Sequence, residues 1–247
     1  MTSSTPTSAC VVLIPIYREN LPADEAWALE QSLKHLAEWP IRFFGPEGLK
    51  IDWYLSRAPK ASYIEYPKSY FISERSYSQL LLSQLFYEPF SQFEYHLICQ
   101  TDAIVLRSDL ATFIAMDYDY WGAPWPKGWS IDLPIHIKGV DRLTKLQAFV
   151  GNGGLSLRRT QKIQSLLDTF PESLHAWKAQ GNPEDVYISL FGSMVENFRI
   201  PNIRTATKFA IELEPEFMLW LNGGIEPFGV HQWQKYGFPT LEQGLES

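Results

Sequence analysis

The strongest constraint on the fold is an apolar run near the start of the chain, Cys10 to Ile16 (CVVLIPI). It lacks the alternation of apolar and polar residues that marks a strand with one wet face, so a strand formed here must be covered on both faces. Tyr95 to Gln100 (YHLICQ) is a second stretch that we interpret in the same way. Strands buried on both faces are typical of parallel sheets, and the two runs therefore predict an α/β protein.

The segments between these two runs alternate in type. Leu21 to Trp39 and Ser76 to Phe86 place apolar residues at helical spacing, whereas Ile41 to Phe44 and Ala61 to Tyr66 are strand-like. This alternation is the pattern of a mostly parallel sheet flanked by helices.

Ligands bind such sheets outside the carboxyl ends of the strands, where the strand order reverses. Three polar or glycine-rich segments follow predicted strands: Pro15 to Glu19, Gly45 to Gly48 and Gln100 to Asp102. We therefore expect the functional site to be built from these strand ends.

The second half of the chain is less regular. Tyr118 to Trp129 is crowded with Trp, Pro and Gly, which predicts a rigid loop, and helices are predicted only at Thr160 to Phe170 and Glu184 to Val195. We expect a disordered tail over residues 1–8 and a single domain over 9–240. Its nucleotide-binding half would cover residues 9–117, and its irregular acceptor and catalytic half residues 118–240.

Composition excludes several classes of function. The 247 residues carry a net charge of −7 with no long basic run, which argues against nucleic acid as a partner. No stretch approaches the roughly 20 apolar residues of a membrane span, and residues 1–8 lack the basic start of a signal peptide. Cys10 and Cys99 lie in apolar stretches and are interpreted as small buried hydrophobes. We expect a cytoplasmic protein.

Two residues are candidate metal ligands. Asp102 follows a predicted strand, where it either caps a turn or holds Mg²⁺ or Mn²⁺ against a diphosphate. His231 is either a hydrogen-bonded core residue or a second ligand, and Asp with His is a reasonable pair for Mn²⁺.

Two acidic residues, Glu184 and Asp185, open a predicted helix. They either stabilise the helix dipole or supply a general base that deprotonates a sugar hydroxyl. The segment Gly151 to Gly154 (GNGG) either binds phosphate or forms a hairpin turn, and it matches no established phosphate-loop pattern. Arg158 and Arg159 after it either meet phosphate or are solvated.

Aromatic residues are dense in the segment Tyr120 to Trp129. Trp121, Trp125 and Trp129 either pack in the core or present flat rings to the apolar faces of an acceptor sugar. Phe217 to Trp220 is a second candidate platform of this kind.

Several of these segments, taken in order, resemble a known family. They are Val12 to Tyr17 (VLIPIY), Phe44 to Leu49 (FGPEGL), Tyr77 to Ser83 with Phe86-Tyr87, Gln100 to Ala103 (QTDA), Tyr120 to Trp125 (YWGAPW), Gly151 to Arg158 (GNGGLSLR), Glu184 to Val186 (EDV) and Phe228 to His231 (FGVH). The series, which runs from about Val11 to Tyr236, resembles a largely uncharacterised family of bacterial and fungal domains grouped with the GT-A nucleotide-sugar glycosyltransferases.

The resemblance implies a GT-A-like fold, with a Rossmann-like, mixed, mostly parallel sheet flanked by helices. It also implies a D-x-D motif whose last Asp, here Asp102, binds the metal. Gln100 replaces the first carboxylate, and it can still bond a ribose hydroxyl. His231 would complete the metal site, and Asp185, with Glu184 beside it, matches the acidic residue that acts as base in inverting members.

The same resemblance assigns the donor site. Pro15, Ile16, Tyr17 and Arg18 match the segment that lines the nucleotide base, and Gly153 and Gly154 match a loop beneath the donor sugar. The remaining donor contacts are Tyr77, Gln100, Thr101 and Asp102. At Tyr77 to Leu80 the chain reads YSQL where relatives read YNRL, which removes a cation near the nucleotide.

We therefore expect a glycosyltransferase that moves a sugar from a nucleoside-diphosphate sugar, most simply a UDP-sugar, to a hydroxyl. The acceptor would be a glycan, a lipid-linked saccharide or a small molecule, and Mn²⁺ or Mg²⁺ would be required. The alternatives are a non-catalytic nucleotide-sugar or carbohydrate-binding module on the same fold, and a nucleotidyltransferase or nucleotide-sugar hydrolase.

Overall fold

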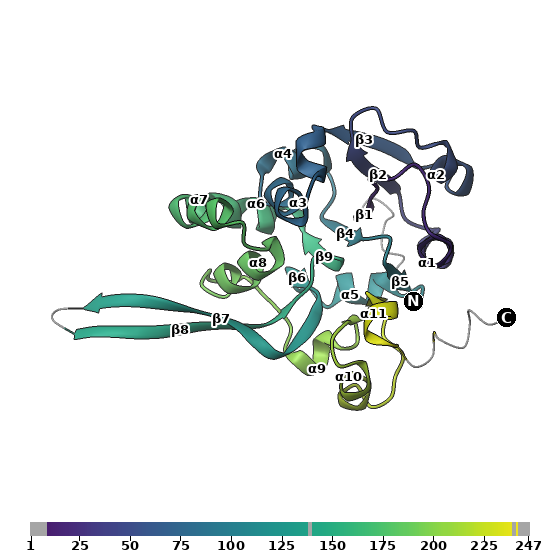
Figure 1. The fold of residues 1–247 in the computed structure, drawn as a ribbon. Helices are drawn as coiled ribbons and strands as arrows, with labels where there is room; N and C mark the ends of the chain where they lie inside the picture. Colours follow the sequence, from purple (N-terminus) through teal and green to yellow (C-terminus); the bar gives the residue numbers. More distant parts are fainter. Residues whose placement is uncertain (1–8, 138–139, 239–240, 242–247) are drawn as a thin grey trace.

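The computed structural model describes residues 9–137, 140–238 and 241, so the tail predicted over residues 1–8 lies outside the described part. The centre of the fold is a six-stranded sheet (Figure 1). Its strands are β1 (Cys10–Pro15), β2 (Ile41–Pro46), β3 (Ser62–Tyr66), β4 (Tyr95–Cys99), β6 (Tyr120–Trp121) and β9 (Leu155–Arg159). They lie in the order β3-β2-β1-β4-β9-β6.

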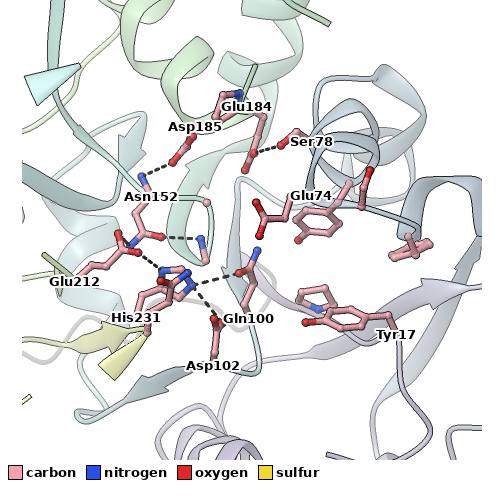
Figure 2. A pocket seen from close by; sticks show the side chains of 18 of the residues that line it. Tyr17, Glu74, Ser78, Gln100, Asp102, Asn152, Glu184, Asp185, Glu212 and His231 are labelled. Carbon is pink, nitrogen blue, oxygen red and sulfur yellow. Dashed lines mark hydrogen bonds and ion pairs between the residues drawn. The ribbon is translucent and has the colours of Figure 1, made fainter. Parts of the chain in front are cut away.

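The sheet is mixed but mostly parallel, as predicted. β1 pairs in parallel with β2 and β4, β2 pairs in parallel with β3, and only β9 runs antiparallel to its neighbours. From β1 the chain builds β2 and β3 on one side and then returns to build β4 on the other. The strand order therefore reverses between β1 and β4, and the side chains at their carboxyl ends line the cleft in Figure 2.

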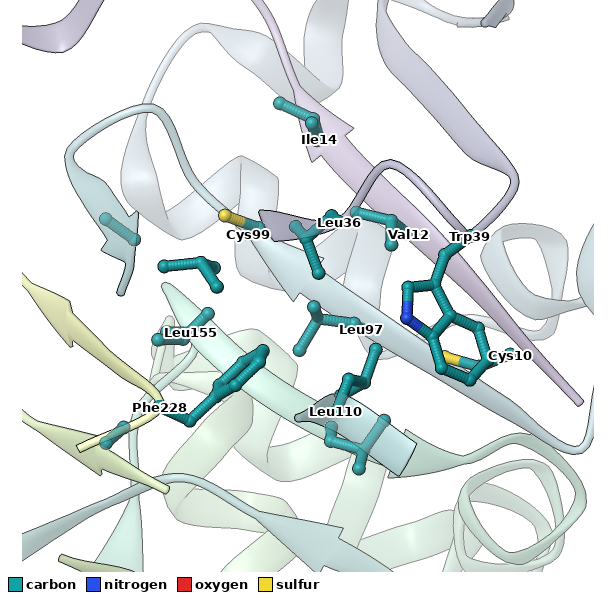
Figure 3. Packing of buried hydrophobic residues seen from close by; sticks show 14 of the residues in the cluster. Cys10, Val12, Ile14, Leu36, Trp39, Leu97, Cys99, Leu110, Leu155 and Phe228 are labelled. Carbon is teal, nitrogen blue, oxygen red and sulfur yellow. The ribbon is translucent and has the colours of Figure 1, made fainter. Parts of the chain in front are cut away.

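The central strand β1 is covered on both faces, which confirms the prediction from its apolar run. Cys10, Val12 and Ile14 pack in one hydrophobic cluster, which includes Leu97 of β4 and is shown in Figure 3. Val11 and Leu13 point the other way into a second cluster. Both cysteines are buried and unpaired, as predicted.

Helices cover both faces of the sheet. They are α1 (Ala23–His35), α2 (Asp52–Arg57), α3 (Glu74–Leu81), α4 (Gln84–Tyr87), α5 (Leu110–Ala115), α6 (Thr160–Thr169), α7 (Pro171–Gln180), α8 (Glu184–Gly192), α9 (Ile203–Ala206), α10 (Pro215–Leu221) and α11 (Trp233–Tyr236), with 3-10 turns η1 (Lys68–Phe71) and η2 (Glu88–Phe90). α1 and α5 contribute to the first cluster, and α3, α6 and α8 to the second. None of these helices, within the described residues, is long and apolar enough to cross a membrane.

One predicted helix is wrong in its extent. The segment Ser76 to Phe86 forms two helices, α3 and α4, because Ser83 adopts an extended conformation between them. Helical spacing of apolar residues continues through this break, so the pattern alone does not reveal it.

The second half is more regular than its composition predicts. β10 (Ala210–Ile211), β11 (Gly229–His231) and β5 (Ala103–Val105) form a small sheet, and β7 (Ala123–Ile137) pairs with β8 (Val140–Gly151). Figure 1 shows the β7–β8 hairpin extending away from the central sheet. The loop predicted over Tyr118 to Trp129 is therefore wrong, since β6 and the first part of β7 occupy it. An irregularity in the pairing between Pro124 and Trp129 accommodates the prolines.

Candidate active site

A cleft of about 460 Å³ opens at the carboxyl ends of β1 and β4. It lies where the sequence predicts a site, because the strand order reverses between these two strands. The predicted site residues that line it are Pro15, Tyr17, Tyr77, Gln100, Asp102, Gly153, Gly154, Glu184, Asp185 and His231.

Three predicted donor contacts do not line the cleft. Ile16 is buried in the core beside β1, and Thr101 is buried with its hydroxyl donating to Glu25. Arg18 lies at the surface, 3.5 Å from Glu25. The prediction treated residues 15–18 and 100–102 as continuous segments, but both continue past the ends of β1 and β4 into irregular backbone, where neighbouring side chains point in different directions and only some of them face the cleft.

One end of the cleft holds the candidate metal ligands. Asp102 follows β4, and His231 ends β11, which pairs with β5 so that His231 lies opposite Ala103. His231 Nε2 is 3.2 Å from Asp102 Oδ1 and 3.3 Å from Gln100 Oε1. On its other side, His231 Nδ1 is 3.1 Å from Glu212 Oε1. The structure therefore brings Asp102 and His231 together, and that they bind a metal stays a prediction.

Charge alternates along this end. Burial by itself lowers the pKa of His231, but hydrogen bonds to Asp102 and Glu212 outweigh burial and raise it to about 9. Burial by itself raises the pKa of Asp102, but the bond to His231 outweighs it, and the net pKa is lowered. Each charged group here is stabilised by a neighbour of the opposite sign.

The residues at this end fit a divalent cation with few protein ligands. At a pKa of about 9, His231 carries a proton on both ring nitrogens, so a metal would bind only after the Nε2 proton is lost. The remaining Nδ1–H then donates to Glu212 and Nε2 faces Asp102, which is the arrangement of a carboxylate-oriented metal-binding histidine. No group of three or more His, Cys, Asp or Glu suited to a metal occurs in the described chain. A cation here would therefore take its remaining ligands from a diphosphate and water, as Mg²⁺ commonly does.

The other end of the cleft holds Asp185, at the start of α8. Asp185 Oδ2 accepts from the backbone N–H of Asn152 at 3.1 Å, and its Oδ1 accepts from the N–H of Val186 at 2.8 Å. Burial and the charge of Glu184 raise the pKa of Asp185 to about 7. A carboxyl group with this pKa can gain and lose a proton near neutrality, as a general base must.

Glu184, predicted as a second catalytic carboxylate, forms a buried ion pair. Arg158 is fully buried beneath the cleft, and its Nη2 donates to Glu184 Oε1 at 3.0 Å. Ser78 donates to the other carboxylate oxygen at 3.0 Å. Both oxygens of Glu184 are engaged by Arg158 and Ser78, so it serves as the buried partner of Arg158, and its assignment as a second catalytic carboxylate stays a prediction that these contacts disfavour. The expectation that Arg158 meets phosphate or solvent is wrong for the same reason.

The Gly151–Gly154 loop lies between the two ends of the cleft. A Cβ on Gly153 would come within 2.4 Å of Glu184 Oε1, and a Cβ on Gly154 within 2.0 Å of His231 Nε2. The glycines are therefore needed because two polar side chains pack directly on the loop backbone.

Several lining residues were not predicted as site residues, and among them are Glu74, Ser78, Asn152 and Glu212. Asn152 lay within the GNGG segment, and its place between glycines was the available signal. Glu212 follows β10, a strand of two residues that no periodic pattern reveals. Glu74 and Ser78 lie on one turn of α3, where polar residues ordinarily indicate a solvated face.

The aromatic residues predicted to bind the acceptor divide into two groups. Trp121 is fully buried against Phe113 and Phe209, so the prediction that it contacts an acceptor is wrong. Trp125 is 6% exposed, and Trp129 is 48% exposed. Both line a separate pocket of about 320 Å³, and neither lines the cleft.

The second predicted platform lies on α10. Phe217 and Trp220 stack with ring centroids 5.9 Å apart, and Trp220 is strongly exposed. Neither residue lines the cleft.

Comparison with solved structures defines the class of fold. The chain is similar to mouse xyloside xylosyltransferase 1 in its apo form, with a TM-score of 0.52 and 12% identity over 89% of this chain and 96% of that one. It is also similar to the galactosyltransferase LgtC in complex with donor and acceptor sugar analogs, with a TM-score of 0.54 and 12% identity over 93% and 87%. The fold is that of the GT-A glycosyltransferases.

Sequence comparison defines the family. Residues 60–231 match the family described as "Protein of unknown function (DUF5672)", and the chain belongs to that family. No curated protein matches the chain.

Proposed function

We propose that this protein is a glycosyltransferase that moves a sugar from a nucleoside-diphosphate sugar to a hydroxyl group of a glycan, a lipid-linked saccharide or a small molecule. One observation carries the proposal. The cleft at the strand-order reversal brings Asp102 and His231 to one end and Asp185, with a pKa near neutrality, to the other (Figure 2). The fold supports this proposal by its similarity to glycosyltransferase structures.

The donor diphosphate would bind at the Asp102 end. None of the described residues that line the cleft is Lys or Arg, so the protein itself supplies little positive charge for a diphosphate. Asp102 and His231 would hold Mn²⁺ or Mg²⁺, which when bound neutralises charge on the departing diphosphate. Gln100 offers an amide to a ribose hydroxyl, and Pro15 and Tyr17 would line the base of a nucleotide such as UDP.

The acceptor would be activated by Asp185. Its carboxylate would take the proton of the acceptor hydroxyl while the acceptor oxygen bonds to the anomeric carbon and the bond to the diphosphate oxygen breaks. A single displacement of this kind inverts the configuration at that carbon. The backbone N–H groups of Asn152 and Val186 hold Asp185 in place for this step.

A non-catalytic binding module is the second candidate. Gln100 stands where relatives carry a carboxylate, and within the described residues only Asp102 and His231 converge as ligands. This donor set favours weak metal binding. A binding module would hold a nucleotide sugar or a carbohydrate in the same cleft without forming a product.

Thermal unfolding against a panel of UDP-, GDP-, CMP- and dTDP-sugars, with and without Mn²⁺, tests the proposal. A donor at 100 times its Kd stabilises the folded state by about 2.7 kcal/mol, which raises Tm by roughly 5–10 °C for a chain of this size. We expect such a shift for one nucleotide class, dependent on Mn²⁺ and abolished by Asp102→Ala. No shift with any donor contradicts nucleotide-sugar binding.

Product analysis then separates the candidates. With an acceptor library present, a transferase forms a glycosylated acceptor and releases nucleoside diphosphate. Free sugar alone indicates a hydrolase, pyrophosphate a nucleotidyltransferase, and bound donor without turnover a binding module.

A further inference from the structure

One residue between the two ends of the cleft uses all of its hydrogen-bonding groups. The backbone N–H of Asn152 donates to Asp185, and its carbonyl accepts from the Tyr120 hydroxyl at 3.2 Å. Its side-chain Oδ1 accepts from the Gly154 N–H at 2.7 Å. Its Nδ2 donates to Glu212 Oε2 at 3.1 Å.

The backbone of Asn152 is strained. Its φ angle of 111° is one that residues with a side chain seldom adopt. Glycine would adopt it freely, and both neighbours in the chain are glycines. A residue with a side chain therefore strains the backbone at this position. The hydrogen bonds made by the Asn152 side chain offset that strain.

The bond to Glu212 continues to the candidate metal site. Glu212 uses one carboxylate oxygen for Asn152 and the other for Nδ1 of His231. The Asn152 amide thus fixes the rotation of the Glu212 carboxylate, and the carboxylate fixes the ring of His231. Because the ring also packs on Gly154, whose N–H bonds to Asn152, two separate contacts connect His231 to this one side chain.

We propose that Asn152 is a positioning residue that couples the metal end of the cleft to the base end. Its side chain orients His231 through Glu212, while its backbone N–H holds Asp185. The inference rests on the proposed function, because it assigns His231 to a metal ion. Groups that orient a metal-binding histidine typically contribute 10–100-fold to metal affinity.

The first test is Asn152→Gly, because glycine accepts the backbone angle and keeps the N–H that bonds to Asp185. Only the three bonds of the side chain are lost, which are those to Glu212 and to the N–H groups of Gly154 and Leu155. Mn²⁺ affinity is measured by titration calorimetry, with Mn²⁺ alone and with Mn²⁺ in the presence of UDP. We expect the Kd for Mn²⁺ to rise about 10-fold or more. Asn222→Ala is the matched control, since it removes another buried amide, bonded to the Ile225 carbonyl outside the cleft, and it leaves the Kd unchanged.

A polarity exchange between residues 152 and 212 provides the second test. Asn152→Asp alone sets two carboxylates against each other, and Glu212→Gln alone sets two amide donors against each other. In the double variant the amide at 212 donates to the carboxylate at 152, and its oxygen still accepts from His231. We expect both single variants to bind Mn²⁺ more weakly and the double variant to recover to within about threefold of the wild type.

The outcomes separate the inference from the proposed function. If the wild type binds Mn²⁺ and Asn152→Gly binds it equally well, the inference is overturned and the metal site stands. The exchange variants give an independent outcome. If both single variants bind Mn²⁺ more weakly and the double variant does not recover the wild-type affinity, the coupling of Asn152 to His231 through Glu212 is overturned. If the folded wild type binds no Mn²⁺, with or without UDP, the metal site itself fails and the inference falls with it.

Discussion

The two ends of the cleft differ in how their charged side chains are arranged. At the metal end, His231 lies between Asp102 and Glu212, so opposite charges alternate and each stabilises the next. At the base end, Glu184 and Asp185 are adjacent carboxylates of like charge. Their repulsion is limited because Arg158 neutralises Glu184 from beneath the cleft.

This difference separates the protonation states of two carboxylates in one site. The pKa of Asp102 is lowered by its bond to His231, which keeps it ionised and ready to bind a cation. The pKa of Asp185 is raised to about 7 by burial and by Glu184, which suits it to exchange a proton. Environments that move the pKa values of neighbouring acids apart are a common basis for assigning different roles to them.

The largest expected effect is on turnover. Asp185→Asn removes the proposed base, and we expect kcat to fall by about 10²–10⁴-fold while donor affinity stays within about threefold. Initial rates of product formation and donor titration measure the two quantities. A variant that keeps more than about a tenth of wild-type kcat would exclude Asp185 as the base.

Arg158, the buried partner of Glu184, should contribute strongly to the free energy of unfolding. Arg158→Met leaves Glu184 buried without a counter-charge, and we expect a loss of about 3–5 kcal/mol in the free energy of unfolding, measured with urea. Adding Glu184→Gln should recover part of that loss. The exposed pair of Arg57 and Glu30 is the matched control, and Arg57→Met should cost less than about 1 kcal/mol. Equal losses of unfolding free energy in Arg158→Met and Arg57→Met would contradict the distinction between the buried and the exposed ion pair.

The raised pKa of Asp185 also predicts how stability depends on pH. The folded state holds the Asp185 proton more tightly than the unfolded chain does, so this contribution is complete below pH 4 and is lost as pH rises toward 7. Asp185→Asn removes that loss. Relative to wild type, the variant should gain on the order of 2 kcal/mol in unfolding free energy between pH 5 and pH 8. The exposed Glu38→Gln serves as control, and a pH-independent difference for Asp185→Asn contradicts the raised pKa.

The smallest expected effect concerns the separate pocket lined by Trp125 and Trp129. If Trp129 contacts the acceptor, Trp129→Ala should raise acceptor KM roughly fivefold, equivalent to about 1 kcal/mol, without changing donor affinity. Trp125→Ala should instead lower stability by about 3–5 kcal/mol, because its ring is 6% exposed and packs on Gly151. An unchanged KM for Trp129→Ala would place the acceptor elsewhere.

Much of the fold could be predicted because its elements carry local patterns. The apolar run at Cys10 to Pro15 predicted a strand covered on both faces, and the alternation of strand and helix predicted a mostly parallel sheet. The β7–β8 hairpin was not predicted because Trp, Pro and Gly at its start locally favour turns, whereas pairing with the next strand along the chain stabilises it. The burial of Trp121 was not predicted for a related reason, because composition does not distinguish a ring in the core from a ring at the surface.

Sequence by itself determined the strand ends that form the cleft and the residue types that can act there, because periodicity and residue chemistry are local properties. Tertiary structure alone decided which of these groups meet. It turned Glu184 toward Arg158, brought Asn152 to Glu212 across 60 residues, and set Asp102 beside His231. Such contacts depend on how distant segments pack, and packing is what sets the burial and the neighbouring charges that give each carboxylate its role.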